Sequence, residues 1–449
     1  MKRVTWSFWA LLLALTGLWL LADTLWPARG GFFAFRTVWV QYSGVLTMGM
    51  MSLAMVLAVR PVWLESHFNG LDKMYRLHKW LGIGALVVGI VHWLWAKGTK
   101  WAVGWGWLEK PARGGGQGPE PTGLEALFLG WRGTAEGLGE WAFYAAVVLI
   151  ALALIQRFPY RLFAKTHQLL AVAYLVLAFH TLVLVKFDYW SQPIGWVMAL
   201  LTAAGSVSAV LVLIGRVGAS RKAGAVIEAL QPYPALNVLE TTMRVDEGWR
   251  GHQAGQFAFV TSDPGEGAHP YTIASAWHPE DRRVAFVTKA LGDHTATLPQ
   301  TLAVGQQVTV EGPYGCFTFG GPQLRQIWIG AGIGITPFLA RMKQLAREPG
   351  GQGAAPREID LIHPTAVEDR AALDRMRADA EAAGVRLHVL VDARDGRLSG
   401  ERLRQMVPGW REASVWFCGP AGFGQALRAD LVAQGLPAGA FHQELFQMR

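Results

Sequence analysis

Residues 77–93 read LHKWLGIGALVVGIVHW, and residues 166–181 read THQLLAVAYLVLAFHT. Each stretch lies in an apolar segment long enough to cross a bilayer as a helix. Each also carries two histidines, His78 with His92 and His167 with His180. Ionisable side chains inside a membrane are costly, so they usually have a function there. The two stretches predict a membrane-embedded helical domain built around four histidines.

Six apolar segments are predicted to cross the membrane, and the four histidines lie on the third and the fifth. The first is expected to be a retained helix, because its apolar run is too long for a secretory signal and no cleavage pattern follows it. Residues 97–140 are expected to form an extracytoplasmic loop at the lipid interface, since they contain a Gly and Pro run and several Trp residues. The six segments are residues 5–26, 38–59, 77–96, 141–156, 167–185 and 194–215.

The basic residues are concentrated in the first half of the chain. Residues 1–222 contain 20 Lys and Arg against 9 Asp and Glu, whereas residues 223–449 contain 21 against 24. The basic clusters all fall on one side of the predicted helices, so the positive-inside rule predicts a multi-pass protein of the inner (cytoplasmic) membrane with both termini in the cytoplasm. Charges divided among helix ends form no continuous patch, which argues against a nucleic-acid partner. Two scattered cysteines, Cys316 and Cys418, exclude a disulfide framework.

The histidine spacings favour two metal-binding pairs. His78 and His92 lie about 21 Å apart along a helix and about 40° apart around it, so both can face one seam. His167 and His180 lie about 20 Å apart but about 140° apart around an ideal helix, so tilt or a local irregularity must correct their directions. Both helices run outward from the cytoplasm, so depth pairs His78 with His167 and His92 with His180. Each pair can ligate one haem iron from opposite faces, while the ordinary alternative is hydrogen bonding between helices.

Beyond residue 222 the pattern changes to short strands. Alternating segments at residues 256–260, 271–274, 284–288 and 308–311 predict a small antiparallel β-barrel. From residue 324, strands alternate with helices, which is typical of a parallel doubly wound sheet. The sequence therefore predicts three domains, at residues 1–222, 223–323 and 324–449.

Two groups of residues in the predicted barrel suit a flavin. In the first, an aromatic ring and a hydroxyl lie side by side on a strand and can stack on an isoalloxazine and bond its polar edge. It comprises His269, Pro270, Tyr271 and Thr272. In the second, a cation and a hydroxyl at a helix start can hold a pyrophosphate, although an ordinary strand and helix cap would look the same. It comprises Lys289, Gly292, Asp293 and Thr295.

A glycine run follows the first strand of the parallel sheet. Residues 330–337 read GAGIGITP, so backbone N–H groups can approach a phosphate at a helix start, although a bare glycine turn is the alternative. The spacing differs from the dinucleotide fingerprint G-x-G-x-x-G. The candidate nucleotide-binding residues here are Gly330, Gly332, Gly334, Thr336 and Pro337.

Two further positions are candidates for contact with the reacting rings. Cys418, Gly419 and Pro420 follow a strand at residues 414–417, where the carboxyl end of a parallel sheet faces its ligand crevice. The alternative for Cys418 is a buried small residue. Phe446 can cover the flavin until nicotinamide displaces it, or it can be a packed terminal aromatic residue.

In this order the residues resemble the ferric reductase and NADPH oxidase superfamily, over nearly the whole chain. The resemblance rests on the histidine spacings of 14 and 13, the groups above, and EGPYG at residues 311–315. It implies a membrane all-α six-helix bundle with two b-type haems, an antiparallel β-barrel FAD domain like that of ferredoxin-NADP reductase, and an α/β NAD(P)-binding domain. It also implies electron flow from NAD(P)H to FAD, then through the inner and outer haems to an acceptor beyond the membrane, with Cys418 and Phe446 at the hydride-transfer site.

The acceptor and the nucleotide preference stay open at this point. Dioxygen giving superoxide is slightly favoured over ferric iron, because a bis-histidine haem transfers electrons without an open iron position and no iron-recruiting cluster is evident. An electron-donating subunit for a periplasmic protein is a second alternative, and a bare membrane anchor for a soluble-type reductase is a third. Relatives that prefer NADPH often have a basic residue where this chain has residues 363–365, HPT, with Arg370, Arg394 and Arg397 further on.

Overall fold

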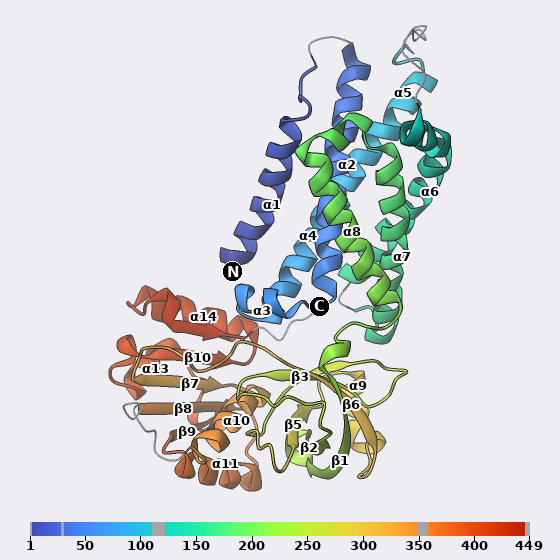
Figure 1. The fold of residues 1–449 in the computed structure, drawn as a ribbon. Helices are drawn as coiled ribbons and strands as arrows, with labels where there is room; N and C mark the ends of the chain where they lie inside the picture. The colour runs from blue at the N-terminus through green and yellow to red at the C-terminus, as the bar shows by residue number, and fades with distance from the viewer. Residues whose placement is uncertain (1, 28–30, 110–121, 156, 349–357, 445–449) are drawn as a thin grey trace. The chain divides into compact units, whose positions relative to one another are not determined.

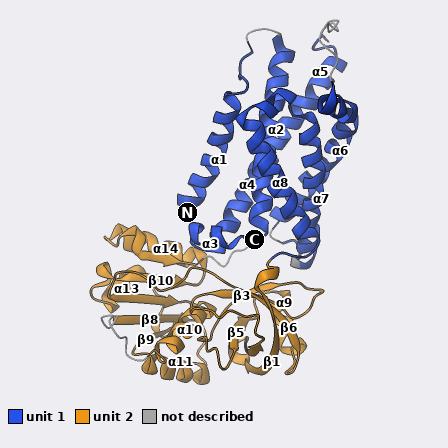
Figure 2. Ribbon diagram, in the orientation of Figure 1, with its two compact units in different colours: residues 1–217, 449 blue, residues 218–448 orange. Residues whose placement is uncertain are grey.

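The computed structural model describes residues 2–27, 31–109, 122–155, 157–348 and 358–444. The chain forms two compact units, residues 1–217 and 218–448 (Figure 2). The first is helical and the second contains two β-sheets (Figure 1). The predicted fold class is confirmed.

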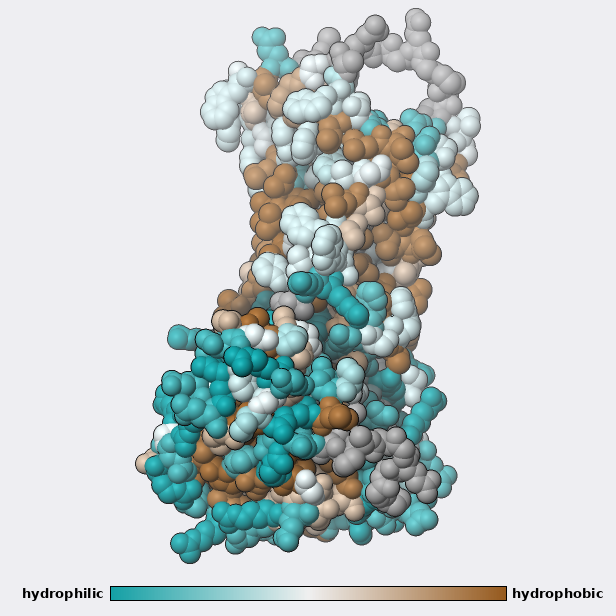
Figure 3. All heavy atoms as spheres, turned by 90° about the vertical axis from the view of Figure 1, so that its left-hand side faces the viewer, coloured by the Kyte–Doolittle hydropathy of each residue, from teal (hydrophilic) through white to brown (hydrophobic). Residues whose placement is uncertain are grey.

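Six helices of the first unit are long and apolar enough to cross a membrane. Apolar side chains gather on the outside of this unit, whereas hydrophilic side chains dominate the visible surface of the second (Figure 3). A helix whose apolar residues face outward is what a lipid environment requires. A short helix α3, Val62–Phe68, precedes α4. The six helices that form the spans are α1 Lys2–Leu20, α2 Gly31–Ala58, α4 Leu71–Trp93, α6 Gly123–Leu154, α7 Tyr160–Leu184 and α8 Pro193–Leu213.

The predicted loop at residues 97–140 is wrong for most of its length. The α4 span continues through a π-helical turn, Leu94–Gly98, into α5, Thr99–Gly104. Helix α6 begins at Gly123 and has 32 residues, so the fourth span is not the shortest one. Its first turns carry charged side chains that lower the local hydropathy but suit an exposed helix, as in the Arg132–Glu136 pair at spacing i, i+4. Hydropathy alone therefore located only the apolar end of this helix.

The first sheet of the second unit is antiparallel and closes on itself. Its order is β4-β3-β6-β1-β2-β5, and a bridge between Ile273 and Phe286 joins the two ends. The inward side chains include Ile227, Met243 and Val310, which form the barrel core. Four of these strands match predicted segments, and β1 and β2 have no predicted counterpart. The elements are β1 Lys222–Tyr233, β2 Val238–Val245, β3 Phe257–Thr261, β4 His269–Thr272, β5 Arg283–Lys289, α9 Asp293–Thr301 and β6 Gln307–Tyr314.

The second sheet is parallel, with the order β11-β10-β7-β8-β9. The chain leaves the central strand β7 toward β8 and β9, and then returns to the other side for β10. The point of reversal, between β7 and β10, is where open α/β sheets bind ligands. The elements are β7 Arg325–Gly330, α10 Thr336–Leu345, β8 Glu358–Thr365, α11 Arg370–Ala382, β9 Arg386–Val391, α12 Asp392–Asp395, α13 Gly400–Met406, β10 Ser414–Cys418, α14 Ala421–Ala433 and β11 Phe441–Gln443.

Polar contacts join the two sheets within the second unit. Arg375 of α11 binds Glu240 of β2 through two hydrogen bonds, of 2.7 and 3.1 Å. Lys343 of α10 donates a hydrogen bond to the carbonyl of Ala274, two residues beyond the end of the HPYT strand. A bidentate Arg–carboxylate pair is geometrically specific, so these contacts orient the α/β part on the barrel.

Candidate functional site

The four histidines lie on α4 and α7, and they meet in the pairs that the depth argument predicts. The ring centres of His78 and His167 are 5.8 Å apart, and those of His92 and His180 are 6.4 Å apart. Helix α7 is α-helical from Tyr160 to Leu184, so no break corrects the directions of its histidines. The rings therefore meet without the local irregularity that was one of the two predicted corrections.

These separations match two imidazoles on a single metal ion. With a metal–nitrogen bond of about 2.0 Å and about 1.1 Å from ring nitrogen to ring centre, two axial ligands have ring centres about 6.2 Å apart. The observed 5.8 and 6.4 Å lie on either side of that value. Each pair is therefore spaced so that its two rings could hold one metal ion between them.

Hydrogen bonds set the ring orientation of three of the histidines. Nδ1 donates to a backbone carbonyl in each case: His78 to Ala54 at 2.9 Å, His92 to Val40 at 3.0 Å, and His180 to Ala135 at 2.9 Å. A carbonyl only accepts, so the proton sits on Nδ1 and Nε2 keeps the lone pair that a metal needs. His167 differs, because its buried Nδ1 has no hydrogen-bond partner among the described residues.

A cavity of about 410 Å³ surrounds the His92–His180 pair. Its volume lies within the range of about 300 to 1,000 Å³ typical of ligand pockets. Most of the lining is apolar, which suits a porphyrin face. The lining also includes four basic side chains, Arg36, Lys97, Lys100 and Arg132, and two carboxylates, Glu136 and Glu140. Lys97 pairs with Glu140, and Lys100 and Arg132 pair with Glu136, so a propionate would have to compete with these carboxylates.

Two glycines leave room for the rings of this outer pair. A Cβ at position 139 would lie 2.0 Å from Nδ1 of His180, and a Cβ at position 44 would lie 3.3 Å from Cε1 of His92. No side chain longer than hydrogen fits at position 139 while His180 keeps its place. The helix backbones thus approach the histidine rings directly, as a flat cofactor between α4 and α7 requires.

The predicted flavin group lies on β4, which pairs with β3. Tyr271 is opposite Ala258 in this pairing, and Thr272 is opposite Phe257. All four residues from His269 to Thr272 are partly buried, so each is within reach of a bound molecule. Consecutive side chains of a strand point to opposite faces, and the ring of Tyr271 packs against Phe286 with centres 6.2 Å apart, so the stacking interpretation stays a prediction.

His294 joins this group, and the sequence analysis passed over it. Its ring stacks on that of His269 with centres 3.7 Å apart and planes 7° apart. Burial lowers the pKa of His269 to about 4, with a further contribution from His294, so the stacked ring of His269 is neutral in the free protein. The available signal was position, since His294 lies between two residues of the predicted pyrophosphate group, Asp293 and Thr295.

The predicted pyrophosphate group lies around the start of α9. A Cβ at Gly292 would meet no atom within 4 Å, so open space adjoins the helix start. The Thr295 hydroxyl, however, accepts hydrogen bonds from the backbone N–H groups of Leu291 and Gly292, at 3.0 and 3.1 Å. This threonine caps the helix, so a phosphate bound by the Thr295 hydroxyl would share it with these two backbone N–H groups. Lys289 ends the neighbouring strand β5.

The glycine run and the Cys418 turn lie against each other at the reversal point of the sheet. Ala331 donates its N–H to the Cys418 carbonyl at 3.0 Å. A Cβ at Gly334 would lie 2.2 Å from that same oxygen, so glycine is required there. Gly332 has a φ of +55° and begins a 3-10 turn that leads into Thr336 and Pro337 at the start of α10. Gly330 and the pair Gly419 and Pro420 complete the two facing turns.

Cys418 is buried at the carboxyl end of β10. Burial raises the pKa of its thiol well above the ordinary value, and the nearby carboxylate of Glu444 raises it further. The thiol is therefore neutral at physiological pH, which favours a packing or contact role over a nucleophilic one. Glu444 is itself buried, and the sequence analysis did not identify it. Phe446 lies outside the described residues.

Two family models match successive parts of the chain. Residues 43–178 match the ferric reductase like transmembrane component, a range that includes His78, His92 and His167 and ends just before His180. Residues 225–318 match an FAD-binding domain, a range that includes the HPYT strand and α9.

Known proteins resemble parts of the chain. An NADPH oxidoreductase of Mycobacterium tuberculosis (strain ATCC 25618 / H37Rv) is 31% identical over 148 residues, which are 31% of this chain and 37% of that protein. Respiratory burst oxidase homolog protein E of Arabidopsis thaliana is 29% identical over 217 residues, 41% of this chain and 21% of that protein. A solved flavohemoglobin from Malassezia yamatoensis, with bound FAD and heme, aligns with 92% of this chain and 97% of its own at 18% identity and a TM-score of 0.46. The chain therefore carries a match to a ferric reductase like transmembrane component followed by a match to an FAD-binding domain, and the proteins that it resembles in part include an NADPH oxidoreductase and a respiratory burst oxidase homolog.

Proposed function

We propose that the protein is a membrane flavocytochrome b that carries electrons from cytoplasmic NAD(P)H through FAD and two b-type haems to dioxygen on the opposite side, giving superoxide. The observation that carries this proposal is that the ring centres of the two histidines in each pair lie 5.8 and 6.4 Å apart, on helices in and beside the region that matches a ferric reductase like transmembrane component.

His78 and His167 would hold the inner haem, and His92 and His180 the outer one. The carbonyls of Ala54, Val40 and Ala135 would keep Nε2 of three of these rings aimed at the metal. A hydrogen bond from Nδ1 to a backbone carbonyl orients a histidine ligand and strengthens the basicity of its Nε2. Each pair of imidazoles would hold one haem iron, and the haems, when bound, would supply the one-electron carriers between flavin and acceptor.

Tyr271 and Thr272 would contact the flavin ring, while His269, His294 and the start of α9 would lie along its phosphates. FAD, when bound, accepts two electrons as a hydride and passes them on singly, which a haem chain requires. The facing turns at Gly330–Gly334 and Cys418–Pro420 would bind the nucleotide phosphates and orient the nicotinamide. A neutral Cys418 would add no charge beside the transferring hydride.

The orientation of the helices follows from the basic residues of the helical unit. Arg3 donates hydrogen bonds to the His67 carbonyl and to Asn69, so the N-terminal end of α1 lies beside α3, near the basic residues Lys73 and Arg76 in the first turns of α4. An excess of Lys and Arg at one end of a bundle marks its cytoplasmic end. We therefore place both termini in the cytoplasm and the outer haem pair on the opposite side of the inner membrane.

Dioxygen is the proposed acceptor because electron transfer from a haem edge needs no open metal position and no built site for a molecule of this size. Ferric chelates and a periplasmic protein are the competing acceptors. The rate of NAD(P)H consumption in air, with no other acceptor added, separates the three acceptors, because only an oxidase consumes NAD(P)H rapidly under that condition.

The test uses purified, FAD-loaded protein supplied with NADH or NADPH in air, with superoxide dismutase-sensitive reduction and iron(III) reduction measured in parallel. The proposal expects a b-type spectrum with two haems per chain and fast superoxide formation. One haem per chain, or none, would overturn it. Reduction of iron(III) without formation of superoxide would show that ferric iron, and not dioxygen, is the acceptor.

A variant separates the steps. His78→Ala or His167→Ala is expected to remove the inner haem and stop superoxide formation, while NAD(P)H still reduces the flavin. Unchanged haem content in both variants would contradict the pairing.

A further inference from the structure

Two loops leave the parallel sheet side by side at its carboxyl edge. Thr365 at the end of β8 is the register partner of Val391 at the end of β9. Strand β8 is the second strand of the unit that begins with β7 and the glycine run. In dinucleotide-binding folds, the residues that follow this second strand face the adenosine ribose, where an acidic side chain favours a free 2′-hydroxyl and an Arg favours a 2′-phosphate.

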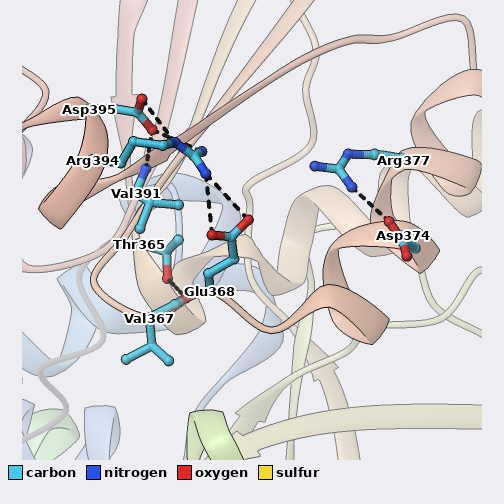
Figure 4. A network of polar contacts seen from close by, with 8 residues as sticks. All are labelled: Thr365, Val367, Glu368, Asp374, Arg377, Val391, Arg394 and Asp395. Carbon is cyan, nitrogen blue, oxygen red and sulfur yellow. Dashed lines mark hydrogen bonds and ion pairs between the residues drawn. The ribbon is translucent and has the colours of Figure 1, made fainter.

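An ion-pair network spans these two loops (Figure 4). Arg394 Nη1 lies 3.4 and 3.2 Å from the two carboxylate oxygens of Glu368. Its Nε and Nη2 lie 3.3 and 3.1 Å from the two oxygens of Asp395. The Asp395 carboxylate also accepts the N–H of Val391 at 2.8 Å, which ties it to the end of β9. Arg394 is therefore held between two carboxylates.

The local charge favours the hydroxyl form of the ribose. In the segments 366–371 and 392–397 the carboxylates are Glu368, Asp369, Asp392 and Asp395, and the guanidinium groups are Arg370, Arg394 and Arg397. The carboxylates outnumber the guanidinium groups, and the Arg394 guanidinium already forms ion pairs with two carboxylates, those of Glu368 and Asp395. A 2′-phosphate with two negative charges would have to pull Arg394 from its partners and lie beside Glu368. A 2′-hydroxyl would instead donate to a Glu368 oxygen.

We propose that Glu368 makes this protein prefer NADH over NADPH, by accepting a hydrogen bond from the adenosine 2′-hydroxyl and by holding Arg394 away from a 2′-phosphate. This inference rests on the proposed use of a reduced nicotinamide nucleotide. It adds which of the two nucleotides is used and which side chain selects it.

The test measures the rate of flavin reduction anaerobically, with NADH and with NADPH, in the purified full-length protein loaded with FAD. The wild-type kcat/KM is expected to be at least about tenfold higher for NADH, because only NADH offers Glu368 a 2′-hydroxyl and NADPH brings a like charge beside it. Glu368→Gln removes the negative charge and frees Nη1 of Arg394, while Asp395 still holds Nε and Nη2, so the ratio is expected to move toward NADPH by about tenfold or more. A wild-type preference for NADPH, or an unchanged ratio in the variant, would overturn the proposal.

Two further variants identify the cause. Asp374→Asn breaks an exposed Arg–carboxylate pair of the same chemistry on α11, where Arg377 lies 2.7 Å from Asp374 (Figure 4), and it is expected to leave the ratio unchanged. The double variant Glu368→Gln with Arg394→Ala is expected to lose the gain in NADPH use, because that gain depends on the released guanidinium. A ratio that shifts equally in the Asp374→Asn protein, or a gain that persists without Arg394, would show that Glu368 does not act in this way.

The same experiment separates this inference from the proposed function. If neither nucleotide reduces the flavin, the proposed function fails. If both nucleotides reduce the flavin and the NADH-to-NADPH ratio of kcat/KM is unchanged in Glu368→Gln, only the proposed selection by Glu368 fails.

Discussion

Gly139 of α6 lies against the ring of His180 so closely that a Cβ at position 139 would be 2.0 Å from Nδ1. The same Nδ1 donates to the carbonyl of Ala135, one turn earlier on α6. Helix α6 therefore both holds this imidazole and leaves the space that it occupies.

Gly139→Ala is expected to displace His180 and remove or weaken the outer haem, while the inner haem remains. The measurement is haem content per chain, together with the reduced b-type spectrum of the purified variant. Gly137→Ala is the matched control, because it adds the same methyl group two residues away, where a Cβ would meet no atom within 4 Å. Equal haem content in both variants would contradict a ligand role for His180.

Gly334→Ala is expected to raise the KM for the nicotinamide nucleotide by about tenfold or more, because the new Cβ would meet a backbone oxygen, that of Cys418, at 2.2 Å. A backbone atom cannot rotate away, so the turn itself has to shift. Dithionite should still reduce both haems. Gly422→Ala, at the start of α14 with no atom within 4 Å of its Cβ, is the control and should leave KM unchanged.

The stability of the second unit is expected to fall as the pH is lowered from 6.5 toward 4, in part because of His252. Burial lowers the pKa of this histidine to about 4, and its Nε2 donates to the Ser275 carbonyl at 3.0 Å. The unfolded chain takes up the proton near pH 6.5 and the folded protein does so only near pH 4, so acid favours unfolding by up to about 3 kcal/mol.

His252→Gln should flatten this acid dependence, because glutamine does not titrate. The measurement is the temperature at which FAD is released from the full-length protein between pH 7.5 and 4.5. Parallel curves for the wild type and the variant would show that His252 does not contribute.

A fragment of residues 1–217, the helical unit by itself, is expected to retain two haems that dithionite reduces and NAD(P)H does not. The physical reason is that every candidate flavin and nucleotide contact lies in the second unit. The measurement is the absorbance change on adding each reductant. Reduction of the fragment by NAD(P)H would refute the assignment of hydride transfer to residues 218–448.

Regular patterns with local causes were predictable. The geometry of one helix was enough to predict that His78 and His92 face the same side of α4. Matching their depths in the membrane with those of His167 and His180 then predicted the pairs across α4 and α7. The alternating segments and the glycine run likewise predicted the antiparallel and parallel sheets. The first turns of α6 were missed because charged residues such as Arg132 lower the hydropathy of a helix whose polar face still forms i, i+4 pairs. His294 was missed because no local pattern marks a ring that stacks on a residue 25 positions earlier.

By itself, the sequence determined the classes of element, the six apolar spans and the residue types available to hold haem, flavin and nucleotide, because periodicity, hydropathy and glycine placement are local properties. Tertiary structure alone decided the separation of the histidine rings, the contact of His269 with His294 and the capture of Arg394 by Glu368 and Asp395. Those relationships depend on distances between segments far apart in the chain, which packing sets and which no local pattern specifies.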